Sequence, residues 1–399
     1  MIDVLVGLLA FVIFVGGALP PARRRALLKA CYIYGIVMLP DRRWHLPAFL
    51  SSKIHRGEPV LAMPGRTLKP DLYRPDDAGA TVRRPAVIVY APLAPQGKRN
   101  KHVVNLLEGL TRAGLVVIVP HWPARPLGLI DDADVQELEE TIEFLAKQPY
   151  VDPDRIGIIA VSYGAGPALI AASRPGIGKR LHYVMSFGGY VDLWSVFHFA
   201  GSGKTRVGAE PLDLSPHPYM HYIILRALSR WLPNKRDRAA LTGFLHTVED
   251  VNAPIDLDQV QAMMSPKGQA LIESLQQASS MSAKQLRAQF PAEVREKADK
   301  LTVHSSMLDD IDAKVMIIHT TNDNLVPYSE ATKLWRHLRA DQRQHWTTLS
   351  GFEHTIPPAL NLKNLFTIYL PNMVRLLTML YEFFLLQEPA AEAPSSARR

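Results

Sequence analysis

The chain of 399 residues exceeds the usual length of a single domain, so the sequence predicts one large domain with insertions, or two domains. Hydrophobic residues make up 47% of the chain and charged residues 21%. This balance excludes a disordered or fibrous chain and is typical of a globular protein with a large core. The single cysteine, Cys31, excludes an internal disulfide.

The net charge of +7 is concentrated in the N-terminal quarter of the chain. Residues 21–101 hold sixteen Lys or Arg against five Asp or Glu, and Arg23, Arg24 and Arg25 come soon after the uncharged segment Val4 to Leu19. A basic segment beside an apolar one is typical of contact with anionic lipid headgroups. No nucleic-acid motif accompanies the charge. We therefore expect contact with a membrane and none with nucleic acid.

The uncharged segment Val4 to Leu19 would extend roughly 24 Å as a helix, at about 1.5 Å per residue. With its flanking residues it comes close to a full membrane span. A cleaved signal peptide begins with basic residues, whereas here Asp3 comes first and the arginines follow. This order predicts an uncleaved anchor and a membrane-associated protein whose following domain faces the cytoplasm. The alternatives are a signal peptide, or a helix that covers the protein or lies in the membrane interface.

Strand and helix patterns alternate through the middle of the chain. Short apolar runs rich in β-branched residues are predicted as strands, at 85–92, 115–120, 155–161, 181–190 and 314–320. Amphipathic or Ala-rich segments between them are predicted as helices, at 101–114, 131–148 and 162–173. Strands that are apolar on both faces and alternate with helices indicate an α/β fold, with a mostly parallel sheet covered by helices on both faces.

Ser162 lies where the predicted strand 155–161 turns into a helix, at the strand end where such sheets carry their functional residues. A tight turn there brings together the residues two before and two after the serine, and Ala160 and Gly164 are both small. This is the pattern of a nucleophile elbow, G-x-S-x-G, with alanine replacing the first glycine. The turn raises the hydroxyl and points the amide of Tyr163 to where an oxyanion would form. A serine that only caps the helix is the alternative.

A serine nucleophile needs a base to take its proton and an acid to orient that base. Asp323 follows the predicted strand 314–320. His354 lies about thirty residues later, in a loop after the strand-like stretch 343–350. The order Ser, Asp, His and the positions at strand ends predict a catalytic triad. An Asx-turn at Asp323 and a surface loop histidine at His354 are the alternatives.

Other acids fit the triad less well. Three aspartates precede the strand and so lie at its wrong end: Asp309, Asp310 and Asp312. Glu353 directly neighbours His354, and immediate neighbours in sequence seldom orient each other's side chains. Asp323 therefore remains the predicted acid.

These segments together resemble the α/β-hydrolase superfamily, in particular its esterase and dienelactone-hydrolase-like branch. The resemblance rests on "LKPDLYRP", "PAVIVYAPLAP", "VDPDRIGIIAVSYGAG", "VMSFGGYVDL", "VMIIHTTNDNLVP" and "GFEHTIPP", and covers roughly residues 60–195 and 311–385. It implies the α/β-hydrolase fold, with Ser162 as the nucleophile, His354 as the general base and Asp323 as the orienting acid.

The resemblance also implies two backbone amides that form an oxyanion hole. One is that of Tyr163, and the other lies in the loop after "VIVY". That loop departs from the family's His-Gly pair, because residues 91–94 read Ala-Pro-Leu-Ala and Pro92 has no N–H to donate. Leu93 is therefore the expected second donor.

Between Tyr190 and Asp310 the alternation stops and helical patterns predominate. Hydrolases of this fold carry a cap over the active site at this point. Three aromatic residues lie where this insertion begins: Trp194, Phe197 and Phe199. They line an acyl pocket or pack the cap onto the core, and both interpretations stay open. His217 and His221 are spaced like two metal ligands on one helix, but no third ligand is evident, and we expect no metal.

The predicted domains are an apolar N-terminal anchor with a basic segment (1–50), the first part of the core (51–195), a helical cap (196–310), the second part of the core (311–387) and a disordered tail (388–399). The apolar segment 361–386 is interrupted by Pro371. We expect it to be the last core helix rather than a second membrane element.

The sequence predicts a serine hydrolase that cleaves carboxylic esters of apolar or lipid-like substrates through an acyl-enzyme, without a cofactor. Its expected partner is a small-molecule or lipid-like ester. The alternatives are a peptidase or amidase with the same triad, an acyltransferase, and a non-enzymatic hydrolase-like scaffold. Triads are shared across these chemistries and the shape of the pocket decides among them, so the natural substrate does not follow from the sequence.

Overall fold

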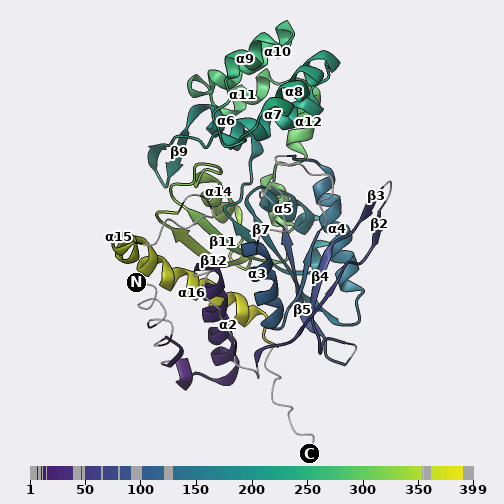
Figure 1. The fold of residues 1–399 in the computed structure, drawn as a ribbon, viewed down its shortest axis with the longest axis vertical. Helices are drawn as coiled ribbons and strands as arrows, with labels where there is room; N and C mark the ends of the chain where they lie inside the picture. The colour runs from purple at the N-terminus through teal and green to yellow at the C-terminus, as the bar shows by residue number, and fades with distance from the viewer. Residues whose placement is uncertain are drawn as a thin grey trace, which may run out of the picture.

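The structure, a computed structural model, describes residues 7, 10, 12–14, 16–38, 46, 50–63, 66–79, 81–90, 101–120, 129–352, 354 and 361–389. Its centre is an eight-stranded sheet in the order β1-β4-β6-β5-β7-β8-β11-β12 (Figure 1). The strands of this sheet are β1 (Ile54–Gly57), β4 (Asp71–Pro75), β5 (Arg84–Tyr90), β6 (Val116–Val119), β7 (Val151–Val161), β8 (Leu181–Phe187), β11 (Lys314–Thr320) and β12 (Arg343–Leu349).

Most of the sheet is parallel. Parallel pairing runs from β6 through β5, β7, β8 and β11 to β12. β4 is antiparallel to both β1 and β6 at one edge. A separate antiparallel hairpin is formed by β2 (Leu61–Met63) and β3 (Arg66–Leu68). The predicted α/β fold with a mostly parallel sheet is confirmed.

Helices cover both faces of the sheet, and alternate residues of β5 show the division. Val87 and Val89 belong to the core on one face, whereas Ala86 and Ile88 belong to the core on the other. The first face carries α2 (Pro21–Met38), α3 (Lys101–Arg112) and α16 (Leu370–Leu386). The second carries α4 (Ala133–Ala146), α5 (Ala165–Ser173), α13 (Ser305–Asp309) and α14 (Ser329–His337). Burial on both faces explains why the central strands are apolar throughout.

The chain between β8 and β11 forms a helical cap at one end of the molecule (Figure 1). Its helices are α6 (Leu193–Ser202), α7 (Tyr219–Trp231), α8 (Lys235–Thr247), α9 (Leu257–Ala262), α10 (Pro266–Gln276), α11 (Ala283–Gln289) and α12 (Ala292–Asp299), with a hairpin of β9 (Lys204–Val207) and β10 (Glu210–Asp213). Their apolar side chains form a third core, which also includes Tyr163 and Val326 of the α/β body. The boundaries predicted between the anchor, the core, the cap and the tail stay predictions.

The membrane anchor predicted at Val4 to Leu19 is contradicted. Among the described residues, which leave out 1–6, 8, 9, 11 and 15, no helix is long and apolar enough to cross a membrane. The basic residues expected at lipid headgroups instead open α2, whose Arg25 pairs with Glu388. The prediction of a membrane-associated protein with a cytoplasm-facing domain is therefore wrong. The apolar half of α2, including Ile33 and Tyr34, is buried in the core on the sheet rather than exposed to lipid.

The apolar segment 361–386 forms α15 (Leu362–Asn364), a π-helical turn η7 (Leu365–Tyr369) and α16. Helix α16 packs against α2 and β12. The ring of Phe383 meets Tyr183 of β8 edge-on, with 5.4 Å between the ring centroids. This segment is the last core helix, as predicted. Residues 390–399 of the predicted tail lie outside the described residues.

Helix α16 offers a matched test of this packing. Phe383 is 1% exposed, whereas Val374 on the same helix is 62% exposed. We expect Phe383→Ala to lower the free energy of unfolding by about 3–5 kcal/mol, because it leaves a cavity in the core. Val374→Ala should change it by less than about 0.5 kcal/mol. Urea unfolding monitored by circular dichroism measures both, and equal effects would show that α16 is not part of the core.

Candidate active site

Two backbone positions near the end of the sheet are strained. Within the described residues, only two non-glycine residues have a positive φ: Ser162, at 55°, and His354, at 53°. Such conformations cost about 1–3 kcal/mol each and gather at functional sites. The structure therefore places this strain at two of the three predicted triad residues.

The turn at Ser162 follows from the small residues that flank it. β7 ends at Val161, Ser162 opens the short 3₁₀ helix η4 (Ser162–Gly164), and α5 follows directly. Ala160 is fully buried, and Ser162 is only partly covered. The chain therefore turns sharply from strand to helix with the serine at the turn, which is the geometry that a nucleophile elbow requires.

The register of the parallel strands brings the other candidate residues to the same edge. Val161 of β7 pairs with Phe187 of β8, which pairs with Ile318 of β11. Ser162 and the loop that holds Asp323 therefore leave the sheet at the same end. The next loop along the edge, after β12, carries His354.

Asp323 and His354 are joined by a hydrogen bond. The Nδ1–H of His354 donates to Oδ2 of Asp323 over 2.6 Å. Oδ1 of Asp323 accepts the backbone N–H groups of Leu325 (2.9 Å) and Val326 (2.8 Å). Burial alone would raise the pKa of Asp323, but the charge and hydrogen bond of His354, with the backbone hydrogen bond of Val326, hold it below its usual range. The fully buried Asp323 therefore stays ionised.

The other ring nitrogen of His354, Nε2, is the atom that the predicted general base would use. Nε2 is buried and, within the described part of the chain, has no hydrogen-bond partner. No hydrogen bond links Nε2 to Ser162. The contact between a serine and its base often shortens to a hydrogen bond only when substrate binds. Because Asp323 holds the proton on Nδ1, the lone pair of His354 lies on Nε2, where a general base needs it.

Gly188 makes room for the imidazole of His354. Gly188 follows β8 at φ +58°, and its N–H donates to the carbonyl of Ile318 over 2.8 Å. A Cβ at this position would lie 2.8 Å from Cε1 and 3.1 Å from Nδ1 of His354. The ring therefore packs against bare backbone. Sequence reasoning missed this role, because "FGGY" looks like an ordinary strand end.

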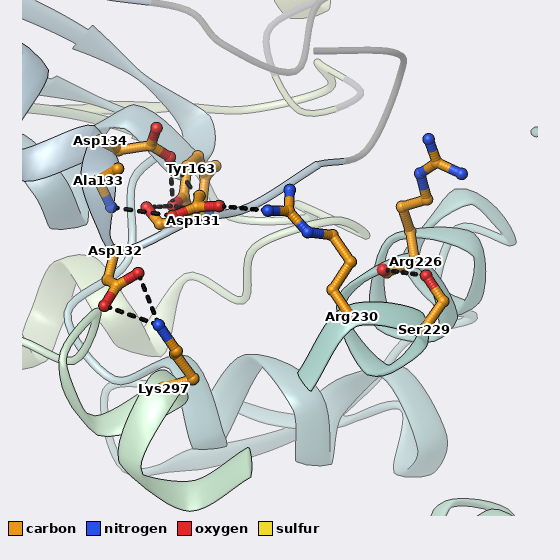
Figure 2. Close-up of polar contacts among 9 residues, drawn as sticks. All are labelled: Asp131, Asp132, Ala133, Asp134, Tyr163, Arg226, Ser229, Arg230 and Lys297. Atoms are coloured by element: carbon orange, nitrogen blue, oxygen red, sulfur yellow. Dashed lines mark hydrogen bonds and ion pairs between the residues drawn. The ribbon is translucent and has the colours of Figure 1, made fainter. Parts of the chain in front are cut away.

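Tyr163, the predicted oxyanion donor, is anchored through its side chain (Figure 2). Its hydroxyl donates to Oδ2 of Asp134 over 2.7 Å and accepts the N–H of Asp131 over 3.3 Å. From the cap, Arg230 of α7 forms an ion pair with Asp131 over 3.0 Å. These contacts fix the residue whose amide would face an oxyanion. Leu93, the second predicted donor, lies outside the described residues.

The alternative acids do not reach this site. Three aspartates precede β11 and so lie at the opposite end of the strand from Asp323: Asp309, Asp310 and Asp312. Glu353 lies outside the described residues.

Of the cap histidines, His217 and His221 have the spacing of two metal ligands, and only His221 lies within helix α7. The Nδ1 atom of His217 accepts the N–H of Tyr219 over 3.2 Å, and burial lowers the pKa of His221. In the part of the chain that the structure describes, no group of three His, Cys, Asp or Glu side chains could hold a metal ion.

The aromatic residues at the start of the cap pack within the cap, although Trp194 also borders a pocket with Arg287 and Lys333. Phe197 and Phe199 are 1% and 0% exposed in the core of the cap. The indole N–H of Trp194 donates to Asp299 over 2.8 Å, and its ring meets that of Phe290 at 5.0 Å. Of the two interpretations left open by the sequence, packing is the one these contacts support.

A sequence model of the X-Pro dipeptidyl-peptidase (S15) family matches residues 65–355. The chain belongs to this family. It is therefore a serine hydrolase of the α/β-hydrolase type, as the sequence predicted. No curated protein matches the chain.

Several solved structures resemble this one at low sequence identity. Est1E from Butyrivibrio proteoclasticus is 12% identical, with 83% of this chain and 98% of that one covered and a TM-score of 0.43. Acetyl xylan esterase 1 from Thermoanaerobacterium sp. is 13% identical, with 83% and 89% covered and a TM-score of 0.41. A puromycin-hydrolyzing peptidase from Mycobacterium tuberculosis is 15% identical, with 78% and 37% covered and a TM-score of 0.43. These similarities are too distant to bear on the activity of this S15-family protein.

Gly188 tests the geometry of the site without touching a charged group. We expect Gly188→Ala to lower hydrolase turnover at least about ten-fold, because the new Cβ displaces His354 from Asp323 and misplaced catalytic groups cost rate steeply. Gly208→Ala is the control: Gly208 also has a positive φ, +64°, but its Cβ would meet nothing within 4 Å. Steady-state rates on a chromogenic ester measure both variants. Equal activity in the two would contradict the close fit of His354.

Proposed function

We propose that this protein cleaves carboxylic esters of apolar acyl groups, with Ser162 as nucleophile, His354 as general base and Asp323 as the acid that orients the base. The observation that carries the proposal is the 2.6 Å hydrogen bond between His354 and Asp323. It keeps the proton on Nδ1 and leaves the Nε2 lone pair to accept the serine proton.

The reaction would proceed through an acyl-enzyme. Nε2 of His354 takes the proton of Ser162 as Oγ attacks the ester carbonyl carbon, and the resulting oxyanion accepts the N–H of Tyr163. The intermediate collapses as His354 protonates the departing alcohol. Water gives a proton to Nε2 of His354 as it attacks the acyl carbon, and the bond to Oγ then breaks as His354 returns that proton to Ser162, which releases the carboxylic acid. Asp323 stays ionised throughout and stabilises the imidazolium, consistent with the low pKa described above.

The apolar character of the acyl group is supported by the surroundings of the predicted triad. Tyr163, next to the nucleophile, and Val326, in the loop of the acid, belong to one apolar cluster with Tyr219 and Tyr222 of α7. Helix α7 is held beside the acid loop, because the N–H of His217 donates to the carbonyl of Asn324 over 2.8 Å. An apolar cluster that reaches from the cap to the residues beside Ser162 and Asp323 favours an apolar substrate over a charged one.

Cleavage of a peptide bond is the second candidate. The observation that favours it is the match of residues 65–355 to the X-Pro dipeptidyl-peptidase (S15) family. The same triad serves both reactions, because each passes through a tetrahedral intermediate and an acyl-enzyme. The leaving group, an alcohol or an amine, is what differs.

The nucleophile can be tested by covalent labelling. We expect a fluorophosphonate probe to label the wild-type protein and to leave Ser162→Ala unlabelled, because the probe needs an activated serine. Mass spectrometry of the labelled peptide identifies the site, and circular dichroism checks that the variant is folded. Labelling that persists in Ser162→Ala would reject Ser162 as the nucleophile.

The acid can be tested by a pair of matched substitutions. Asp323→Asn should lower turnover by about three to four orders of magnitude, since an amide cannot hold the imidazole in the required tautomer. Asp312→Asn, at the other end of β11, should keep wild-type turnover. A fully active Asp323→Asn protein together with an inactive Asp312→Asn protein would show that the wrong carboxylate was chosen.

The leaving group can be tested with paired chromogenic substrates. We expect the wild-type protein to hydrolyse p-nitrophenyl esters, with kcat/KM rising from acetate to longer acyl chains because added methylene groups bind the apolar surroundings. X-Pro p-nitroanilides should be cleaved more slowly than these esters. Faster cleavage of the anilides, abolished by Ser162→Ala, would favour the peptidase instead.

A further inference from the structure

A second histidine lies against the carboxylate of Asp323. His319 is near the end of β11, four residues before Asp323, and is 1% exposed. Its Nε2 lies 2.9 Å from the carbonyl oxygen of Val326 and 3.4 Å from Oδ2 of Asp323. The ring of Tyr328 stands edge-on to the imidazole, with 5.9 Å between centroids. The sequence showed His319 only as part of an apolar strand.

The contacts of His319 define its protonation state. The carbonyl of Val326 can only accept, so Nε2 carries a proton and donates it. Nδ1 is buried and has no hydrogen-bond partner among the described residues, so a second proton there would have no acceptor. Burial lowers the pKa of His319 below its ordinary value, although the charge of Asp323 opposes this. His319 is therefore a neutral donor.

His319 closes a ring of contacts around the acid. The N–H of Val326 donates to Oδ1 of Asp323, and the carbonyl of the same residue accepts from His319. The Nε2 atom of His319 also lies 3.4 Å from Oδ2, the oxygen that accepts Nδ1–H of His354. A positively charged residue in this place would neutralise Asp323 and repel the imidazolium of His354. A neutral donor supports the carboxylate and leaves its charge to His354.

We propose that His319 is a positioning residue: its Nε2–H holds the Asp323–Val326 loop so that Oδ2 of Asp323 stays aimed at Nδ1 of His354. The proposal rests on the proposed function, because the triad that His319 positions is the one assigned above. It concerns a group that touches no substrate and acts through Asp323.

Two substitutions of similar polarity separate this role from simple packing. His319→Gln places an amide N–H near the position of Nε2, whereas His319→Asn places it near Nδ1. We expect His319→Gln to keep most of the wild-type kcat. His319→Asn should lose about a hundred-fold in kcat with little change in KM, because Asp323 and His354 lose alignment rather than substrate contacts. His182→Asn, on β8 and partly buried, is the control and should keep wild-type kinetics.

A spectroscopic readout does not depend on turnover. A proton held between Nδ1 of His354 and Asp323 gives a low-field ¹H NMR resonance, assigned by its loss in His354→Ala. We expect this resonance in the wild-type protein and in His319→Gln, and its upfield shift or loss in a folded His319→Asn.

Two results would overturn the proposal. One is a folded His319→Asn protein with wild-type kcat and an unchanged resonance, and the other is a His319→Gln protein as impaired as His319→Asn. A wild-type protein that no fluorophosphonate labels would refute the proposed function alone, since the resonance still reports whether His319 aligns Asp323 with His354.

Discussion

The hydrogen bond between His354 and Asp323 is the contact on which the rest of the site depends. It joins the loops that follow two neighbouring strands, β11 and β12, and both partners are buried. His354 adopts a positive φ of 53° to reach it, and Gly188 leaves the space that the ring occupies. One charge-assisted hydrogen bond thus holds the strained loop of His354, and such a bond is stronger than a hydrogen bond between two neutral groups. The parallel register then places Ser162 at the same edge.

Helix α7 connects the cap to both sides of this arrangement. Just before the helix begins, the N–H of His217 donates to the carbonyl of Asn324, directly after Asp323. At its end, Arg230 pairs with Asp131, which in turn holds the hydroxyl of Tyr163 (Figure 2). One cap helix and the residue that leads into it thus contact the loop of Asp323 and the partners of Tyr163, which neighbours the proposed nucleophile. Displacement of α7 would loosen both, so the cap contributes to the site beyond covering it.

The parts of the site that the sequence could predict are those set by local geometry. Ser162 was recognisable because only small flanking residues allow a sharp turn from strand to helix. Asp323 followed from its position after an apolar strand, and His354 from chain order. The roles of His319 and Gly188 depend on which side chains meet across different strands, and no local pattern encodes that.

The prediction of a membrane anchor in the N-terminal segment was wrong for a related reason, because a local pattern does not show what an apolar segment contacts. Hydropathy and nearby arginines are compatible with a membrane and also with a helix packed on a protein core. The structure shows the second outcome for α2, the helix that follows the predicted anchor, whose apolar half is buried beside α3 and α16.

The proposed triad can be tested most directly by a crystal structure of the protein inactivated by a fluorophosphonate. We expect phosphorus bonded to Oγ of Ser162, Nε2 of His354 within about 3.2 Å of the adduct, and the phosphoryl oxygen accepting the N–H of Tyr163. An adduct on another side chain, or an imidazole of His354 turned away from Asp323 and the adduct, would contradict it.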